Sequence, residues 1–107
     1  MQTLKKQIHT ANRTQFIDIT GSIREAVSES GIHSGLVTIF TPHTTAGITI
    51  NENADPDVKH DLSWKLNQLI PEKERAYRHL EGNSDSHLKS SLVGPSLTLI
   101  IENGDII

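Results

Sequence analysis

The sequence predicts one small domain that combines β-strands with two α-helices. Its 107 residues are the length of a single domain and suffice for a core without cross-links. Three patterns predict this mixed class. They are an apolar, β-branched run at 36–40, a capped amphipathic stretch at 56–69, and a hairpin turn at Asn103-Gly104.

Two strands are expected near the beginning of the chain, at 2–9 and 14–19, where residues that favour strands are frequent. Thr20 is expected to cap a short helix, whose buried stripe follows from apolar residues at i, i+3 and i+4. Gly31 is expected to end this helix, because glycine readily adopts the left-handed conformation found there.

The apolar run at 36–40 stops at Pro42, which cannot donate to a sheet ladder. A polar turn of one histidine and three threonines follows, and Gly47 then opens a second alternating strand at 48–50. A turn held between two strands can fix the geometry of functional side chains. The alternative is a threonine-rich turn whose hydroxyls bond only to its own backbone.

Asp55 and Pro56 indicate the start of the second helix, as a capping carboxylate followed by proline at the first helical position. The apolar spacing predicts a helix over 56–69, and Pro71 stops it. The segment 72–95 is irregular, with a short helical turn expected near 86–92.

A buried strand is expected at 96–102, and the Asn103-Gly104 turn leads into a return strand at 105–107. So short a return arm would leave an apolar strand edge unpaired, which folded proteins usually avoid. We therefore expect the single domain at 1–107 to be incomplete at its C-terminal end and the natural chain to continue.

The net charge, the apolar runs and the lack of cysteine exclude several classes of function. Ten Lys and Arg against 13 Asp and Glu give a net charge of −3, which disfavours nucleic-acid binding. No apolar run approaches the ~18 residues of a membrane span, and no leader-like segment opens the chain. We therefore expect a cytoplasmic protein without a membrane partner. The chain has no cysteine, so disulfides and thiolate metal ligands are excluded.

Among the six histidines, His43, His79 and His87 are the candidate metal ligands. Three neutral imidazoles that leave one position open form a catalytic zinc site, which lowers the pKa of its bound water to about 7. His79 and His87 are eight residues apart, a spacing that matches no local metal motif. The alternative is that the histidines are scattered over the surface.

Glu52 and Asp61 are the candidates for a general base or for orienting another catalytic group. The alternative for Asp61 is an exposed carboxylate on a helix. A second set of polar side chains could orient a substrate or bind an anion through hydroxyls and helix N-terminal N–H groups. Thr44, Thr45, Ser90 and Ser91 are the candidates for orienting a substrate, and Asn83, Ser84, Ser90 and Ser91 are those for binding an anion. Equally, they could be ordinary polar residues of loops.

Several segments resemble the YjbQ-type family, whose members are also named secondary thiamine-phosphate synthase enzymes. The segments that carry the resemblance are Thr41-Pro-His-Thr-Thr-Ala-Gly-Ile-Thr-Ile-Asn-Glu-Asn-Ala-Asp-Pro-Asp-Val58, Tyr77-Arg-His79, and Asn83 to Ser96. The likeness runs over essentially the whole chain. It departs at the C-terminal end, where the family continues with a Gly-Thr-Trp-Gln segment that is absent here.

The resemblance implies an α+β fold with strands and two helices in β2-α-β2-α-β order followed by further strands, in antiparallel or mixed sheets. It implies a homotrimer and a histidine-rich pocket with a bound metal or anion. The motif histidines of the family match His43, His79 and His87. It further implies weak formation of thiamine phosphate from a pyrimidine diphosphate and a thiazole phosphate.

Two functions remain open. The first is a trimeric, metal-dependent enzyme that acts on a small phosphorylated molecule, by transfer or by hydrolysis. Zinc suits three histidines, whereas a diphosphate substrate normally requires Mg²⁺ and carboxylates. The second is a non-catalytic, trimeric module that binds a small ligand or a metal.

Overall fold

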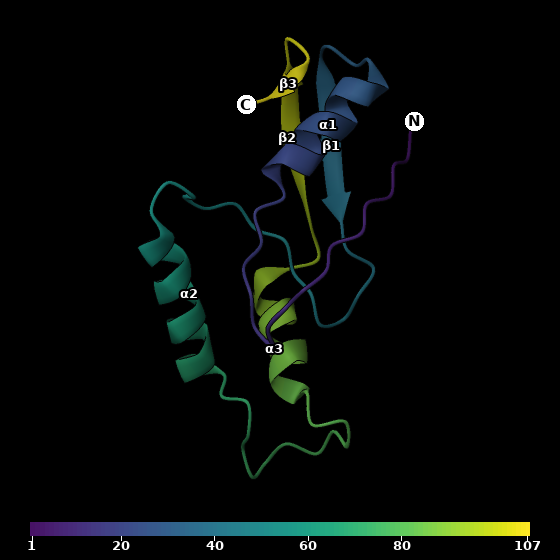
Figure 1. Cartoon of the computed structure of the whole chain (residues 1–107). Helices are drawn as coiled ribbons and strands as arrows, with labels where there is room; N and C mark the ends of the chain where they lie inside the picture. Colours follow the sequence, from purple (N-terminus) through teal and green to yellow (C-terminus); the bar gives the residue numbers. More distant parts are fainter. The chain divides into compact units, whose positions relative to one another are not determined.

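The computed structural model describes residues 1–107 and contains three helices and three strands (Figure 1). The chain divides into two compact units. Unit 1 consists of residues 1–38 and 98–107, and unit 2 consists of residues 39–97. The fold class is α+β, as expected from the sequence, although the third helix was expected only as a short turn.

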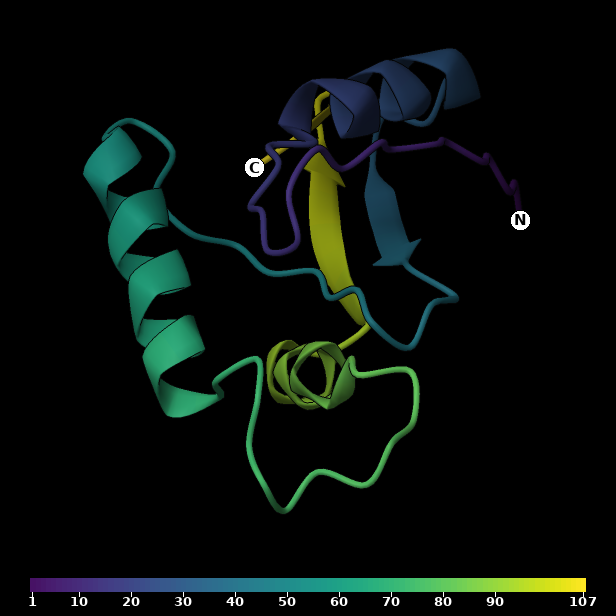
Figure 2. The same cartoon turned by 60° about the horizontal axis from the view of Figure 1, so that its bottom comes forward.

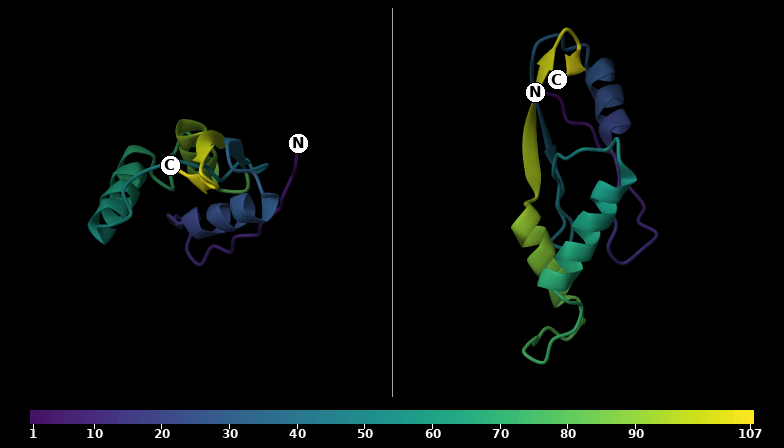
Figure 3. Two further views of the ribbon diagram at one scale, coloured as in Figure 1. Left: turned by 90° about the horizontal axis from the view of Figure 1, so that it is seen from above. Right: turned by 90° about the vertical axis from the view of Figure 1, so that its left-hand side faces the viewer.

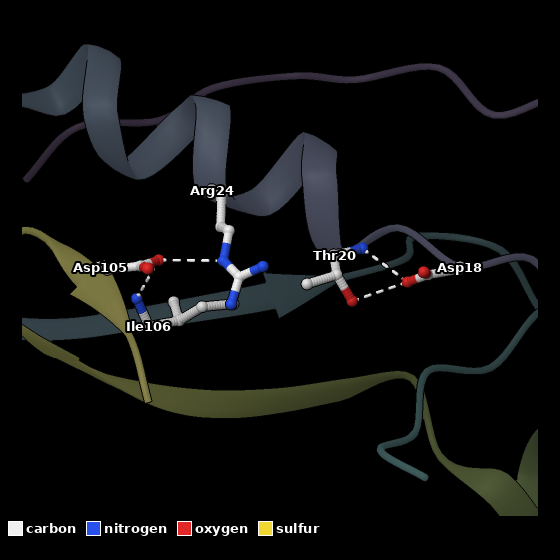
Figure 4. Close-up of polar contacts among 5 residues, drawn as sticks. All are labelled: Asp18, Thr20, Arg24, Asp105 and Ile106. Atoms are coloured by element: carbon white, nitrogen blue, oxygen red, sulfur yellow. Dashed lines mark hydrogen bonds and ion pairs between the residues drawn. The ribbon is translucent and has the colours of Figure 1, made fainter. Parts of the chain in front are cut away.

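Helix α1 spans Thr20–Ser30 and belongs to unit 1. Its N-cap is Ile19, whose carbonyl oxygen accepts from the Ile23 nitrogen, and Oδ1 of Asp18 accepts hydrogen bonds from the Thr20 backbone nitrogen at 2.9 Å and hydroxyl at 2.6 Å (Figure 4). The prediction that Thr20 is the N-cap was therefore wrong, because Thr20 is the first helical residue and its hydroxyl donates to Asp18 instead of accepting from the helix backbone. Gly31 ends the helix with φ 70°, as predicted.

The strands form one sheet in the order β1-β2-β3. Strand β1 spans Gly35–Phe40, β2 spans Ser96–Glu102 and β3 spans Asp105–Ile106. Strands β2 and β3 are antiparallel, with Ile101 opposite Ile106. Helix α1 lies on one side of these strands (Figure 3). The side chains of Val27 on α1 and Ile101 on β2 are the buried apolar residues, at 3% and 2% exposure.

The Asn103-Gly104 turn forms the β2–β3 hairpin, as the sequence predicted. Both residues have positive φ, 53° and 78°, which is the backbone of a two-residue turn that matches strand twist. The Gly104 nitrogen also donates to the carbonyl oxygen of His33 at 2.9 Å. This bond ties the hairpin to the chain that enters β1.

Three expected strands are absent from the structure: residues 2–9, 14–19 and 48–50 are not strands. Residues 1–13 are all exposed, so their β-favouring side chains bury no face. Strand preference depends on such burial and on a neighbouring ladder more than on the residue itself. At 48–50, one backbone bond, from the Ile48 nitrogen to the Gly94 oxygen, replaces a ladder.

Unit 2 contains the other two helices. Helix α2 spans Pro56–Leu69, with the bounds expected from the sequence. The Asp55 carboxylate accepts from the Asp57 nitrogen at 2.9 Å, and Pro56 occupies the first helical position. Helix α3 spans Ser84–Val93 and is longer than the turn expected at 86–92. None of the three helices is long and apolar enough to cross a membrane.

Candidate functional site

An open pocket of about 540 Å³ lies within unit 2, where the chain between α2 and α3 meets the first turns of α3. Figure 2 looks along α3 and shows the connecting segment as a wide loop that returns to the start of the helix. The residues that line the pocket are Ala76, Tyr77, Arg78, His79, Ser84, His87 and Leu88. The loop and the helix therefore each provide one wall.

Two of the three predicted metal ligands meet in this pocket. The rings of His79 and His87 have centroids 5.1 Å apart and planes at 82°, so one ring edge faces the other ring. Nε2 of His79 also lies 4.0 Å from the carboxylate of Glu81. One histidine comes from the loop and one from α3, which explains why their sequence spacing matches no local motif.

His43 does not line this pocket; it is exposed and lies in the segment between β1 and α2. The structure contains no group of three His, Cys, Asp or Glu side chains arranged to hold a metal ion. The trio of metal ligands stays a prediction, with two members adjacent and the third apart.

Two pocket residues, Tyr77 and Arg78, were missed as candidates. The Tyr77 hydroxyl donates to the Pro71 carbonyl oxygen at 2.9 Å, which fixes one end of the loop. Burial, followed by the negative charges of Glu74 and Asp85, raises the pKa of Tyr77 above 10.0. The available signal was the run Tyr77-Arg78-His79, in which a cation and a hydroxyl directly precede a candidate histidine.

The predicted polar residues near α3 are engaged with the backbone. Ser90 and Ser91 both donate their hydroxyl protons to the His87 carbonyl oxygen, at 3.0 and 2.8 Å. The same Ser90 hydroxyl also faces the Thr44 carbonyl oxygen, so its one proton is shared between the two acceptors. A hydroxyl has one proton, so in this arrangement these serines can offer a ligand mainly acceptor positions. Oδ1 of Asn83 is buried without a hydrogen-bond partner beside the first residue of α3.

The remaining candidates lie outside the pocket lining. Thr45 and Glu52 are exposed in the segment between β1 and α2, and the Glu52 nitrogen bonds the Asn51 side chain at 2.7 Å. Asp61 is exposed on α2, with an oxygen 3.0 Å from Nδ1 of His60. The roles predicted for these carboxylates and hydroxyls stay predictions.

Helix α3 also carries a buried ion pair that the sequence analysis missed. Nζ of Lys89 lies 3.2 Å from Oδ2 of Asp85 and 2.6 Å from Oδ1 of Asn67 on α2. Asp85 is 1% exposed and Lys89 is 8% exposed. A lysine four residues after an aspartate reads as an ordinary surface pair, so the spacing gave no sign of burial.

Residues 5–107 match the family described as "UPF0047 protein YjbQ-like". The chain is 58% identical over 100 residues to UPF0047 protein MJ1081 of Methanocaldococcus jannaschii, covering 94% of this chain and 72% of that protein. It is 50% identical over 101 residues to UPF0047 protein YugU of Bacillus subtilis, covering 94% of this chain and 76% of that protein.

A solved structure agrees with this assignment. The crystal structure of a YjbQ/UPF0047 family protein from Clostridium acetobutylicum superposes with a TM-score of 0.89 at 52% identity, over 92% of this chain and 76% of that one. The sequence match, the relatives and the fold thus agree, and the chain belongs to the YjbQ-like UPF0047 family.

Proposed function

We propose that the pocket between residues 76–79 and the first turns of α3 binds a small phosphorylated molecule, on which the protein acts as a metal-dependent enzyme. The observation that supports the proposal is the meeting of His79 and His87, 5.1 Å apart, in a pocket that Arg78 and Ser84 also line. These side chains come from two separate elements and converge on one open space.

The residues of the pocket suit a phosphate group. Arg78 can donate two parallel hydrogen bonds to phosphate oxygens, and imidazole N–H groups can donate further ones. Ser84 is the first residue of α3, where unpaired backbone N–H groups and the helix dipole favour an anion. One wall thus supplies the cation and the other supplies backbone donors.

The pocket offers a metal only part of a ligand set. Imidazole nitrogens are suitable zinc ligands, and two of them are adjacent in the pocket. A set of three protein ligands is not assembled, however, since His43 is not part of the lining. The residues therefore fit two ligand positions and not a complete site. Zinc, or Mg²⁺ for a diphosphate, remains part of the proposal.

The reaction proposed is either transfer to a thiazole phosphate or hydrolysis of the phosphorylated molecule. Glu52 or Asp61 would then move the proton, and Thr44 and Thr45 would orient the substrate. Both carboxylates lie outside the pocket lining, so they would have to act on a substrate that extends beyond it. The homotrimer implied by the resemblance and the cytoplasmic setting expected from the sequence belong to this proposal.

Binding is tested first, with inorganic phosphate as the probe. We expect Arg78→Ala to weaken phosphate binding in isothermal titration by about tenfold, since hydrogen bonds to charged groups contribute ~1.5–3 kcal/mol. The matched control is Arg75→Ala, three residues earlier and outside the lining. Equal affinities of the two variants would contradict the proposed pocket.

Metal dependence is tested by zinc titration of the wild type, His87→Ala and the control His60→Ala, whose imidazole is exposed on α2. Loss of about one bound zinc in His87→Ala alone would support the metal proposal. Turnover is then measured as pyrophosphate release from a pyrimidine diphosphate with a thiazole phosphate, with and without metal. Ligand binding without any turnover would favour the non-catalytic trimeric module.

A further inference from the structure

The buried group on α3 joins three side chains of two helices. Nζ of Lys89 is 3.2 Å from the Asp85 carboxylate on its own helix and 2.6 Å from the amide oxygen of Asn67 on α2. Asp85 is almost wholly buried and Lys89 nearly so. This group is therefore a polar connection between the two helices of unit 2.

Burying such a pair brings little net stability. Removing two charges from water costs several kcal/mol per ion, and the attraction between them often only offsets that cost. Apolar side chains of similar volume would hold two helices together at least as well. Unlike apolar side chains, an ion pair favours one relative orientation of the two helices, because its hydrogen bonds are satisfied in only one arrangement.

The orientation of α3 affects the pocket because of where the ion pair lies on this helix. Asp85 and Lys89 are four residues apart and share one face of the helix. Ser84, His87 and Leu88 share a different face, and all three line the pocket. At 3.6 residues per turn, a rotation of α3 that moves Lys89 away from Asn67 also turns His87 away from the pocket.

The opposite wall of the pocket, formed by the loop, is held close to the end of α2. Tyr77 in the loop donates to the carbonyl oxygen of Pro71, which comes two residues after the last residue of α2. The loop is thus fixed at the end of α2, while α3 is fixed at Asn67 within α2. One polar bond thus holds the loop wall just beyond the end of α2, and another holds α3 to a residue within α2.

We propose that Lys89 and Asp85 are positioning residues of the pocket. Held by Asn67, the ion pair sets the rotation of α3 about its own axis and so places the His87 ring against that of His79. The ligand expected in the pocket rests on the proposed function. The placement of the two rings does not.

The test compares Lys89→Met with Lys89→Arg and with the control Lys65→Met, which removes an exposed lysine bonded to Gln68 on α2. Two quantities are measured. The first is the contact of the His79 and His87 rings, from cross-ring NOEs and imidazole chemical shifts. The second is the affinity for Zn²⁺ and for inorganic phosphate. Circular dichroism shows whether each variant is folded.

We expect Lys89→Met to lose the cross-ring NOEs and to bind the probe about tenfold more weakly, as is typical when a partner that orients a ligand is removed. Lys89→Arg should largely restore both, because it keeps the charge and the donors. Lys65→Met should change neither. A folded Lys89→Met variant with unchanged ring contacts would overturn the proposal.

If Lys89→Met does not fold, Asn67→Ala decides, with Gln68→Ala as its control. Asn67 is exposed, so its replacement leaves the two buried charges paired and the chain folded. Altered ring contacts in Asn67→Ala support the proposal, and unaltered contacts overturn it. If wild-type protein binds neither Zn²⁺ nor phosphate, the proposed function fails, and the NOEs still decide the positioning role.

Discussion

Arg24 on α1 donates from Nε to Oδ1 of Asp105 on β3 at a distance of 3.1 Å. Figure 4 shows that the same carboxylate also accepts from the backbone nitrogen of Ile106, at 2.8 Å. The side chains of Arg24 and Asp105 are 57% and 56% exposed. The pair therefore connects the helix to the hairpin in unit 1 under strong solvent screening.

We expect Arg24→Ala to lower the free energy of unfolding by only ~0.2–1 kcal/mol, because exposed ion pairs gain little in water. The loss should shrink further at high salt, where charges are screened. Urea denaturation at low and high ionic strength measures both effects. A loss of several kcal/mol that does not depend on salt would show that Arg24 acts through packing instead.

Val27 should contribute to stability as a fully buried side chain does, because it is one of two buried apolar residues. Val27→Ala removes buried methyl groups and leaves a cavity, so we expect it to cost about 1–3 kcal/mol. Leu36→Ala is the control, since Leu36 is 68% exposed. In thermal unfolding, Val27→Ala should have a lower midpoint than Leu36→Ala. The reverse order would refute this account of the core.

Gly47 has no room for a side chain. A Cβ built there would lie 2.8 Å from Cγ1 of Val93 and 3.1 Å from the carbonyl oxygen of Gly94. Gly47→Ala should therefore force the segment away from α3 and cost about 1–3 kcal/mol. Gly21→Ala is the matched control, because it has open space and lies in α1, where alanine is stabilising by about 1 kcal/mol.

The clash at Gly47 can be separated from a backbone effect with a second variant. Adding Val93→Ala to Gly47→Ala removes Cγ1 of Val93, the nearest atom, and leaves the Cβ of residue 93 at 2.9 Å. We expect the double variant to lose less stability than the sum of the two single variants, as measured in a double-mutant cycle. Strict additivity would show that Cγ1 of Val93 is not the cause and would leave the Cβ of residue 93 and the Gly94 oxygen as the clashing atoms.

Tyr77 should titrate above its ordinary pKa in the folded protein. Burial and then the charges of Glu74 and Asp85 disfavour the tyrosinate. A raised pKa means that the folded state holds the phenol proton more tightly, so this stabilisation is complete below pH 10.0 and is lost as the pH rises through the folded pKa. Because the chain has one tyrosine, its absorbance reports this group alone.

The matched variants for that titration are Glu74→Gln and Glu81→Gln. Glu74→Gln should lower the folded pKa of Tyr77 towards 10.0, because it removes one of the two charges that raise it. Glu81→Gln removes a carboxylate that does not contribute and should leave the pKa unchanged. A midpoint at the unfolded value in wild-type protein would contradict the burial of the phenol.

Local chemistry in the sequence was enough to predict the capped elements. Asp55 with Pro56 predicted the start of α2, and Asn103-Gly104 predicted the hairpin, because each needs only its own side chains and backbone. The strands expected at 2–9 and 14–19 are absent since a strand depends on a neighbour that the local pattern does not specify.

Only part of the candidate site was predicted, because residue type can be read locally whereas contacts between distant segments cannot. His79 and His87 were named from residue type and meet in the structure. Their partners Tyr77 and Arg78 were missed, because only the folding of the loop against α3 places them in one pocket. The burial of Asp85 and Lys89 depends on the contact with Asn67, and residue spacing carries no information about that contact.

Three hydrogen bonds connect residues 41–48, which include His43, to the C-terminal end of α3 and the two residues after it. The Thr41 nitrogen bonds the Pro95 oxygen, the Ile48 nitrogen bonds the Gly94 oxygen, and Ser90 bonds the Thr44 oxygen. The amide hydrogens that donate in these bonds exchange with solvent when the bonds open as one cooperative unit. The Thr41 and Ile48 amides should therefore exchange at one common rate, and a displacement of the 41–48 backbone from α3 requires the opening that this rate reports.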